Sequence, residues 1–208
     1  MNAIPYRRSA FQVSLLSVAT GGLYVFWWAF WARRWSSATL EREDQPLWKT
    51  IALIVPIFNL FLIFEIGQRI EGAAWRANLS AGSKPLGLLG LAYFVISVMW
   101  RLPDPYWLIC LLSFIPLGIL QLVLVRAAVV LQGPAAAPTR FHWVEWVVIV
   151  LGCVLWVLAF LASVLPNPDG TSSPAPWFPA LVAVATVVAL ILFARAGRGL
   201  VATSEEAA

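Results

Sequence analysis

TGGLYVFWW, residues 20–28, places two adjacent glycines and four aromatic residues inside an apolar run that extends from Ser9 to Ala32 without a charge. Glycine has more backbone freedom than any other residue and weakens the interior of a helix. Whether this run forms one helix or two therefore decides how the first part of the chain folds.

The composition indicates an integral membrane protein. Apolar residues make up 61% of the chain and charged residues 12%, whereas soluble domains contain roughly 45–50% and 25%. Such a chain lacks the polar residues to cover a water-soluble globule, so we expect the lipid bilayer to surround it. The net charge of +4 is attributed to Lys and Arg between the apolar runs, which set topology and contact headgroups. We therefore expect no nucleic-acid partner.

Six apolar stretches approach the ~20 residues that a helix needs to cross the hydrocarbon core. Backbone amides in lipid must be paired within their own segment, which favours helices. We predict an all-α integral membrane helical bundle of about six transmembrane helices, forming a single membrane domain over residues 1–200 with a flexible tail at 201–208. The predicted helices cover about 10–32, 50–68, 85–100, 106–125, 143–165 and 177–194.

The distribution of Lys and Arg predicts that both termini are cytoplasmic, in a bacterial cytoplasmic (inner) membrane. With six complete spans, nine of these residues lie on the inner side and five on the outer side, and four of the five fall in the loop that follows the first span. Positive residues prefer the cytoplasmic side, so this loop conflicts with the rule. If the first two segments were instead re-entrant hairpins that break at Gly21-Gly22 and at Pro56, the count would be thirteen against one.

Two explanations of the glycine pair remain open. We expect a complete first span in which small residues, Ser17, Gly21 and Gly22, allow a neighbouring helix to approach closely, as in many membrane bundles. In that case the Thr20 hydroxyl can bond a loosened carbonyl. The alternative is the re-entrant hairpin, which requires other parts of the protein to cover the broken backbone.

Several apolar and aromatic motifs resemble a bacterial domain-of-unknown-function family of small multi-pass helical membrane proteins. The resemblance covers most of residues 9–165 and implies a helical membrane architecture and a bacterial origin, with no assigned activity or catalytic residues. Its motifs are TxGxYxxxW at 20–28, PLWK at 46–49, LPDPY at 102–106, LLSFIPLGILQ at 111–121 and the Trp-Val-Glu-Trp of residues 143–146.

Polar groups within the apolar segments are the candidate functional residues, because a charge there costs at least ~2.5–3.5 kcal/mol. Glu65 precedes Arg69 by four residues, the spacing of a helical ion pair. We interpret the Glu65–Arg69 pair as structural or interfacial. The alternative is a polar cluster that binds an ion, proton or headgroup, formed by Glu65, Arg69, Asn59, Gln121 and Arg126. Asn59 is interpreted as an interhelical hydrogen-bonding residue.

The basic and aromatic residues at 33–35 are expected at the membrane surface. Arg33 and Arg34 would contact lipid phosphates, and Trp35 would anchor that end of the helix in the headgroup layer. His142 is the sole histidine, and no metal-binding, phosphate-binding or nucleophile motif is found, so the sequence predicts no metal, no cofactor and no enzymatic activity.

These observations predict a structural, accessory or partner-binding membrane component of unknown molecular activity, with the lipid bilayer and a membrane-protein partner or a second copy as its contacts. The alternative is a small oligomeric transporter or channel with a polar cluster around Glu65. It predicts that Glu65, Asn59, Gln121 and Arg126 line one water-accessible cavity, whereas the accessory function predicts that they are paired or lie at the rim.

Overall fold

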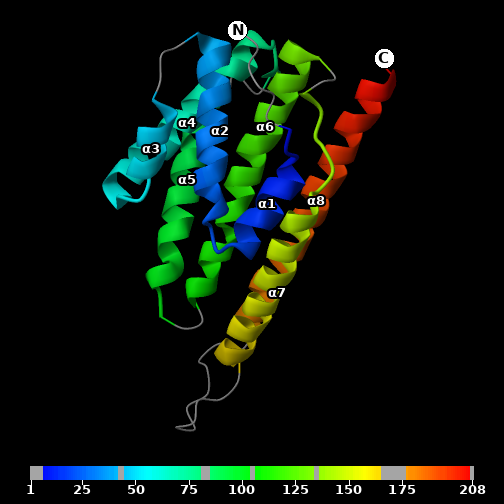
Figure 1. Ribbon diagram of the computed structural model, residues 1–208. Helices are drawn as coiled ribbons and strands as arrows, with labels where there is room; N and C mark the ends of the chain where they lie inside the picture. Colours follow the sequence, from blue (N-terminus) through cyan, green and yellow to red (C-terminus); the bar gives the residue numbers. More distant parts are fainter. Residues whose placement is uncertain are drawn as a thin grey trace.

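The computed structural model describes residues 7–41, 45–80, 85–103, 106–133, 136–164 and 177–206. Within these ranges the chain is all-α, with eight α-helices and short 3-10 helices and no strand. The helices form one elongated bundle in which α1 lies centrally, and both ends of the chain lie near its upper end (Figure 1).

The first apolar run is not one helix, so the prediction of a continuous span over 10–32 is wrong. It forms α1 (Ala10–Ala19) and α2 (Tyr24–Leu40), which run in opposite directions and are joined by a turn partway along the bundle (Figure 1). In a continuous helix, residues 8 and 28 would be about 30 Å apart. Both instead contact the same side chain, Gln121.

The glycine pair is the reason for this break. Gly21 has a φ of +59° and Gly22 a φ of +92°, which glycine adopts at little cost. The Gly22 amide donates to the Ser17 carbonyl at 2.8 Å and the Gly21 amide to the Val18 carbonyl at 3.1 Å, the bond pattern of a Schellman helix end. The Thr20 hydroxyl donates to the Leu16 carbonyl and accepts from the Tyr24 amide, so it bridges the two helices.

The second predicted segment, 50–68, is also broken. The chain forms α3 (Pro46–Ala52), a turn at 53–55 and α4 (Pro56–Arg76). Both helices have a proline in the first turn, where the missing amide hydrogen costs no hydrogen bond. Val55, before Pro56, is extended, because proline disfavours the helical conformation of the residue that precedes it.

The next segment agrees in position with the prediction at 85–100, and the one after it begins at 106 as predicted but continues to Gln132, past the predicted end at 125. They form α5 (Leu86–Val98), which continues as η2 (Met99–Arg101), and η3 (Tyr106–Ser113), which continues as α6 (Phe114–Gln132). The 27 residues of Tyr106–Gln132 are long and apolar enough to cross a membrane, and they are the one helical stretch among the described residues that is. A buried core helix would share these properties, and 56% of an apolar 18-residue window of this stretch is buried.

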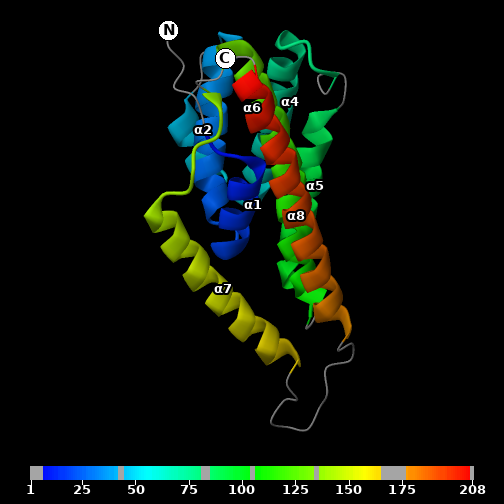
Figure 2. The same cartoon turned by 90° about the vertical axis from the view of Figure 1, so that its right-hand side faces the viewer.

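The last two helices are α7 (Trp143–Val164) and α8 (Trp177–Glu206). α7 runs obliquely to the bundle and converges with α8 toward its lower end (Figure 2). The helix α8 continues to Glu206, so the flexible tail predicted from 201 is wrong up to that residue, while 207–208 lie outside the described residues.

Glycines set the close helix crossings. A Cβ on Gly67 of α4 would lie 2.5 Å from the Leu86 carbonyl oxygen of α5, and one on Gly90 of α5 would lie 2.5 Å from the Ile63 carbonyl oxygen of α4. Gly152 of α7 is packed in the same way against Ala19 at the end of α1. Small residues that bring backbones together are common in helical membrane proteins.

Candidate functional site

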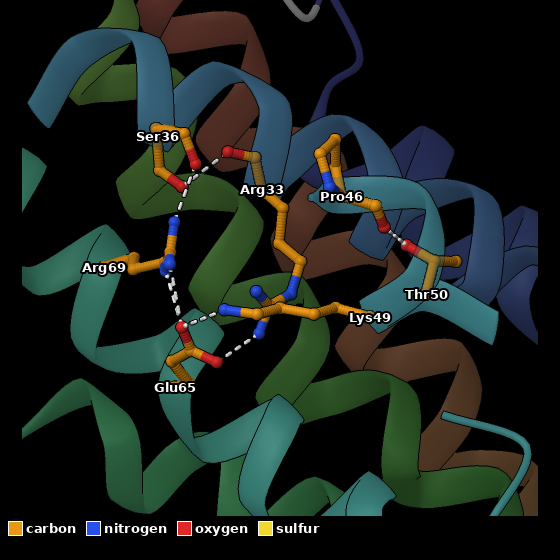
Figure 3. Close-up of polar contacts among 8 residues, drawn as sticks. Arg33, Ser36, Pro46, Lys49, Thr50, Glu65 and Arg69 are labelled. Atoms are coloured by element: carbon orange, nitrogen blue, oxygen red, sulfur yellow. Dashed lines mark hydrogen bonds and ion pairs between the residues drawn. The ribbon is translucent and has the colours of Figure 1, made fainter. Parts of the chain in front are cut away.

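The most concentrated group of charges is an ion-pair cluster around one carboxylate (Figure 3). Glu65 of α4 accepts from Arg33 of α2 at 2.5 Å, from Lys49 of α3 at 3.2 Å and from Arg69 of α4 at 2.8 Å. Arg69 also donates to the Ser37 hydroxyl of α2 at 2.6 Å. We call Glu65, Arg33, Lys49 and Arg69 the Glu65 cluster; it joins three helices through a single acidic residue.

The Glu65 cluster is buried on one side and open on the other. The Arg33 side chain is 0% exposed and that of Arg69 is 7% exposed, whereas Lys49 and Glu65 are 37% and 32% exposed. Burying a guanidinium is costly unless a partner compensates its charge. Glu65 is therefore required to keep Arg33 and Arg69 in the interior.

The sequence predicted only part of this cluster. The Glu65–Arg69 pair at spacing i, i+4 is confirmed. Arg33 and Lys49 were not assigned to it, because they come from other helices and the break at 53–55 was needed to bring α3 against α4. The predicted headgroup contacts are wrong for Arg33 and Trp35, which are buried. Arg34 is exposed, and its guanidinium lies 5.3 Å from the centre of the Trp31 ring.

Gln121 of α6 is fully buried and connects α2 with the segment that precedes α1. Its Oε1 accepts from Trp28 Nε1 at 2.7 Å, and its Nε2 donates to the Arg8 carbonyl oxygen. Gln121 is thus occupied by these partners and is not brought into the Glu65 cluster. Arg126, five residues further along α6, is exposed. The predicted convergence of Gln121 and Arg126 with Glu65 is therefore wrong.

The segment before α1 is held by a second set of polar contacts. Ser9 and Gln12 form a capping box at the start of α1, and Gln12 Nε2 also donates to the Thr139 carbonyl at 2.7 Å. Arg8 pairs with Glu145 at the start of α7 at 2.8 Å. Residues 7–12 are in this way attached to α7 and to the segment between α6 and α7.

Asn59, Ser17, Gly21 and Gly22 lie on one cavity rather than on a helix–helix contact. A Cβ on Gly21 or Gly22 would have no atom within 4 Å, so the prediction that these glycines allow close helix packing is wrong. They supply the positive φ angles of the turn instead. The close approach to α1 comes from Gly152, which lies far along the chain and could not be assigned to α1 from its spacing.

The described residues contain no group of His, Cys, Asp or Glu that could hold a metal ion, and Cys110 and Cys153 are free thiols. The carboxylate of Glu65 is engaged by three cations, which suits it to joining helices rather than to exchanging protons with a substrate. No protein family, curated protein or solved structure matches the chain in the comparisons.

Proposed function

We propose that the chain is a multi-pass integral protein of a bacterial cytoplasmic membrane, with both termini in the cytoplasm, that serves as a structural, accessory or partner-binding component. The resemblance of its motifs to a family of small multi-pass membrane proteins of unknown function supports the same proposal. We propose no catalytic role and no cofactor.

The observation that carries the proposal is the apolar outer surface of α7 and α8. Soluble monomers rarely expose apolar patches larger than a few hundred Å², and a helix that is apolar on every side requires an apolar environment. On both helices, large apolar side chains with exposed fractions of 45% or more recur from turn to turn. They are Trp143, Val144, Trp146, Val147, Val150, Leu151, Val154, Leu155, Val157, Leu158 and Leu161 on α7, and Leu181, Val184, Val187, Val188, Ile191 and Leu192 on α8.

Tyr106–Gln132 is by itself long and apolar enough for a complete crossing, and we propose four complete crossings and two half-crossings in all. We assign the crossings to α5 with η2, η3 with α6, α7, and α8. In the α1–α2 hairpin, the ten residues of α1 descend and the nine residues of α2 before Arg33 rise. Each of these two arms is about 14–15 Å long. In α4, nine residues precede Glu65. Each hairpin then reaches about half of the ~30 Å hydrocarbon core.

The positive charges support the same topology. Arg76 at the end of α4 donates to the Thr39 and Leu40 carbonyls at the end of α2, so these two helices end on one side of the bundle. The chain then descends along α5 to Arg101 at the opposite end (Figure 1). With two hairpins, thirteen of the fourteen Lys and Arg residues fall on the cytoplasmic side, and the positive-inside conflict of six spans is removed.

The polar contacts favour an accessory component over a transporter built around Glu65. Arg33, Lys49 and Arg69 each donate to the Glu65 carboxylate, and Gln121 bonds Trp28 and Arg8. Their pairing is what the accessory function predicts. The exposed apolar surface of α7 and α8 then offers a contact for lipid and for a membrane-protein partner or a second copy.

Cysteine accessibility tests the proposal. Cys110 and Cys153 are replaced by serine, and single cysteines are introduced as Ala38→Cys near the end of α2 and Leu102→Cys after η2, both at exposed positions. After carbonate washing, the chain should remain in the membrane fraction. A membrane-impermeant maleimide should label Ala38→Cys only in inverted vesicles and Leu102→Cys only in spheroplasts.

Two results would contradict the proposal in different ways. Release of the chain into the soluble fraction would refute the membrane location itself. Labelling of Ala38→Cys from the outside, with the chain retained in the membrane, would refute the hairpins and restore the six complete spans.

A further inference from the structure

A cavity of about 670 Å³ lies directly against the turn between α1 and α2. Its wall combines the backbone of Gly21 and Gly22 with Asn59 from α4 and with side chains from α5, η3 and α7. Irregular backbone at membrane depth is found where it is covered by protein or lines a cavity. The volume is within the range of small-molecule sites, about 300–1,000 Å³.

Two polar atoms on this wall are buried and have no hydrogen-bond partner among the described residues. They are the Ser17 hydroxyl oxygen and Asn59 Oδ1, and Ser17 as a whole is 5% exposed. A buried polar atom without a partner costs about 1–3 kcal/mol. A rotation of each side chain that turns these atoms into the cavity would let a ligand donate a hydrogen bond to Asn59 and exchange one with Ser17, which would remove this cost.

The cavity favours an uncharged ligand. The described residues that line it carry no ionisable acid or base of the Asp, Glu, Lys or Arg type, and aromatic rings from Trp100, Trp107 and Trp156 form much of its wall. A charged group placed there would lose its hydration without gaining a counter-ion. A hydroxyl-bearing head can instead use the two unpaired atoms.

A second cavity, of about 420 Å³, adjoins the first and is lined by residues of α1, η3, α7 and α8. The parts of α7 and α8 that line it are those that converge toward the lower end of the bundle (Figure 2). Its wall is almost entirely apolar, with Thr186 as its one hydroxyl among the described residues, and that hydroxyl donates to the Val182 carbonyl. The two cavities share Val18, Leu111 and Trp156 in their walls. A hydrocarbon chain could therefore lie beside a polar head without a charged group between them.

Trp156 fixes the junction of the two cavities. Its indole Nε1 donates to the Val18 carbonyl at 2.6 Å, and its ring stacks on Trp107 with ring centres 6.1 Å apart. The bond holds α7 against the end of α1, and the ring presents a flat face at the junction. Aromatic groups with one polar atom engaged and an apolar face free suit the region where a polar head meets a hydrocarbon chain.

We propose that the two cavities together bind an uncharged, single-chain amphiphile, with its hydroxyl-bearing head against Asn59 and Ser17 and its hydrocarbon chain between α7 and α8. This inference rests on the proposed membrane location, since the ligand would enter from the bilayer. It is separate from the Glu65 cluster, which takes no part in the site.

Photo-crosslinking tests the site with a defined probe. The full chain is reconstituted in nanodiscs, and 1-oleoylglycerol carrying a diazirine in its chain is added at increasing concentration. Saturable labelling is expected, competed by unlabelled 1-oleoylglycerol and mapped to peptides from α7 or α8. The matched oleic acid probe, which carries a carboxylate in place of the glycerol head, should label at least fivefold less at equal concentration.

Variants separate a bound head from simple partition into lipid. Asn59→Leu should weaken competition by 1-oleoylglycerol about fivefold to tenfold, the effect of one lost hydrogen bond. Ser17→Ala, a smaller change, should weaken competition by 1-oleoylglycerol about twofold to fivefold. It replaces Asn59→Leu as the test variant if Asn59→Leu does not fold. Gln68→Leu, which removes an exposed amide from the same helix α4 outside the cavity, should leave competition unchanged.

The inference is overturned if labelling is not saturable, or if the oleic acid probe labels equally and neither cavity variant changes competition. Either result would leave the membrane location intact, because that location is judged by fractionation and cysteine labelling. A chain that is released from membranes would instead refute the location on which the site depends.

Discussion

Replacing Glu65 by Gln should destabilise the bundle by leaving two buried guanidinium groups without their carboxylate. Glu65 accepts from three cations on α2, α3 and α4, and Arg33 is 0% exposed. Breaking a buried ion pair by removing one partner costs about 3–5 kcal/mol. Because Glu65 is 32% exposed, water would compensate part of the loss, and we expect about 2–3 kcal/mol.

Thermal unfolding in detergent, followed by tryptophan fluorescence, measures this effect. For a chain of about 200 residues, 1 kcal/mol corresponds to about 2–4 °C, so Glu65→Gln should lower the Tm by about 4–12 °C. Glu41→Gln is the control, since it removes a carboxylate from an exposed position and should change stability by less than about 0.5 kcal/mol.

The double variant Glu65→Gln with Arg33→Met tests the cause of the loss. It removes the most deeply buried cation together with its partner, and should recover a large part of the lost Tm, because a buried pair replaced by apolar groups is often neutral or stabilising. If Glu65→Gln unfolds at the temperature of the unchanged protein, or if adding Arg33→Met lowers the Tm further, the Glu65 cluster does not stabilise the fold by compensating buried charge.

Gln121→Leu should lower the free energy of unfolding by about 2–4 kcal/mol, because the indole of Trp28 and the carbonyl of Arg8 each lose a buried hydrogen-bond partner. Equal Tm values for Gln121→Leu and the unchanged protein would contradict the stabilising role of these two hydrogen bonds. Gly152→Leu should prevent the close contact with Ala19 and reduce the yield of monodisperse protein in size-exclusion chromatography, whereas tolerance of the leucine would show that the contact is not tight. Gly21→Ala should lower the free energy of unfolding by about 1 kcal/mol or more, because Gly21 has a φ of +59°. A Tm raised by this substitution would contradict the Schellman geometry at the end of α1.

The helical nature of the chain and most helix positions could be predicted from the apolar runs. The break at 21–22 was visible as Thr-Gly-Gly, a sequence suited to a helix end, and the break near Pro56 as a proline inside an apolar run. Sequence periodicity could not decide between a tolerated glycine and a turn. That choice depends on whether other segments cover the turn, which is a property of tertiary packing.

The candidate site was predictable only where it was local. The pair of Glu65 and Arg69 follows from helix geometry, but the contacts of Arg33 with Glu65 and of Trp28 with Gln121 join residues 32 and 93 positions apart. The predicted surface position of Arg33 failed for the same reason. A charged residue next to a long apolar run is normally at the boundary, and here another helix supplies a carboxylate that lets it be buried.

The bond between Trp28 and Gln121 also imposes an order on biogenesis. The two residues are 93 positions apart, and a ribosome adding about 5–20 residues per second needs roughly 5–20 s to make the intervening chain. Until α6 has been synthesised, the indole and the Arg8 carbonyl lack the Gln121 amide as a partner, and the first hairpin lacks these contacts. Newly made α1 and α2 must therefore wait for α6, and a nascent chain stalled before residue 121 would leave both helices open to proteolysis.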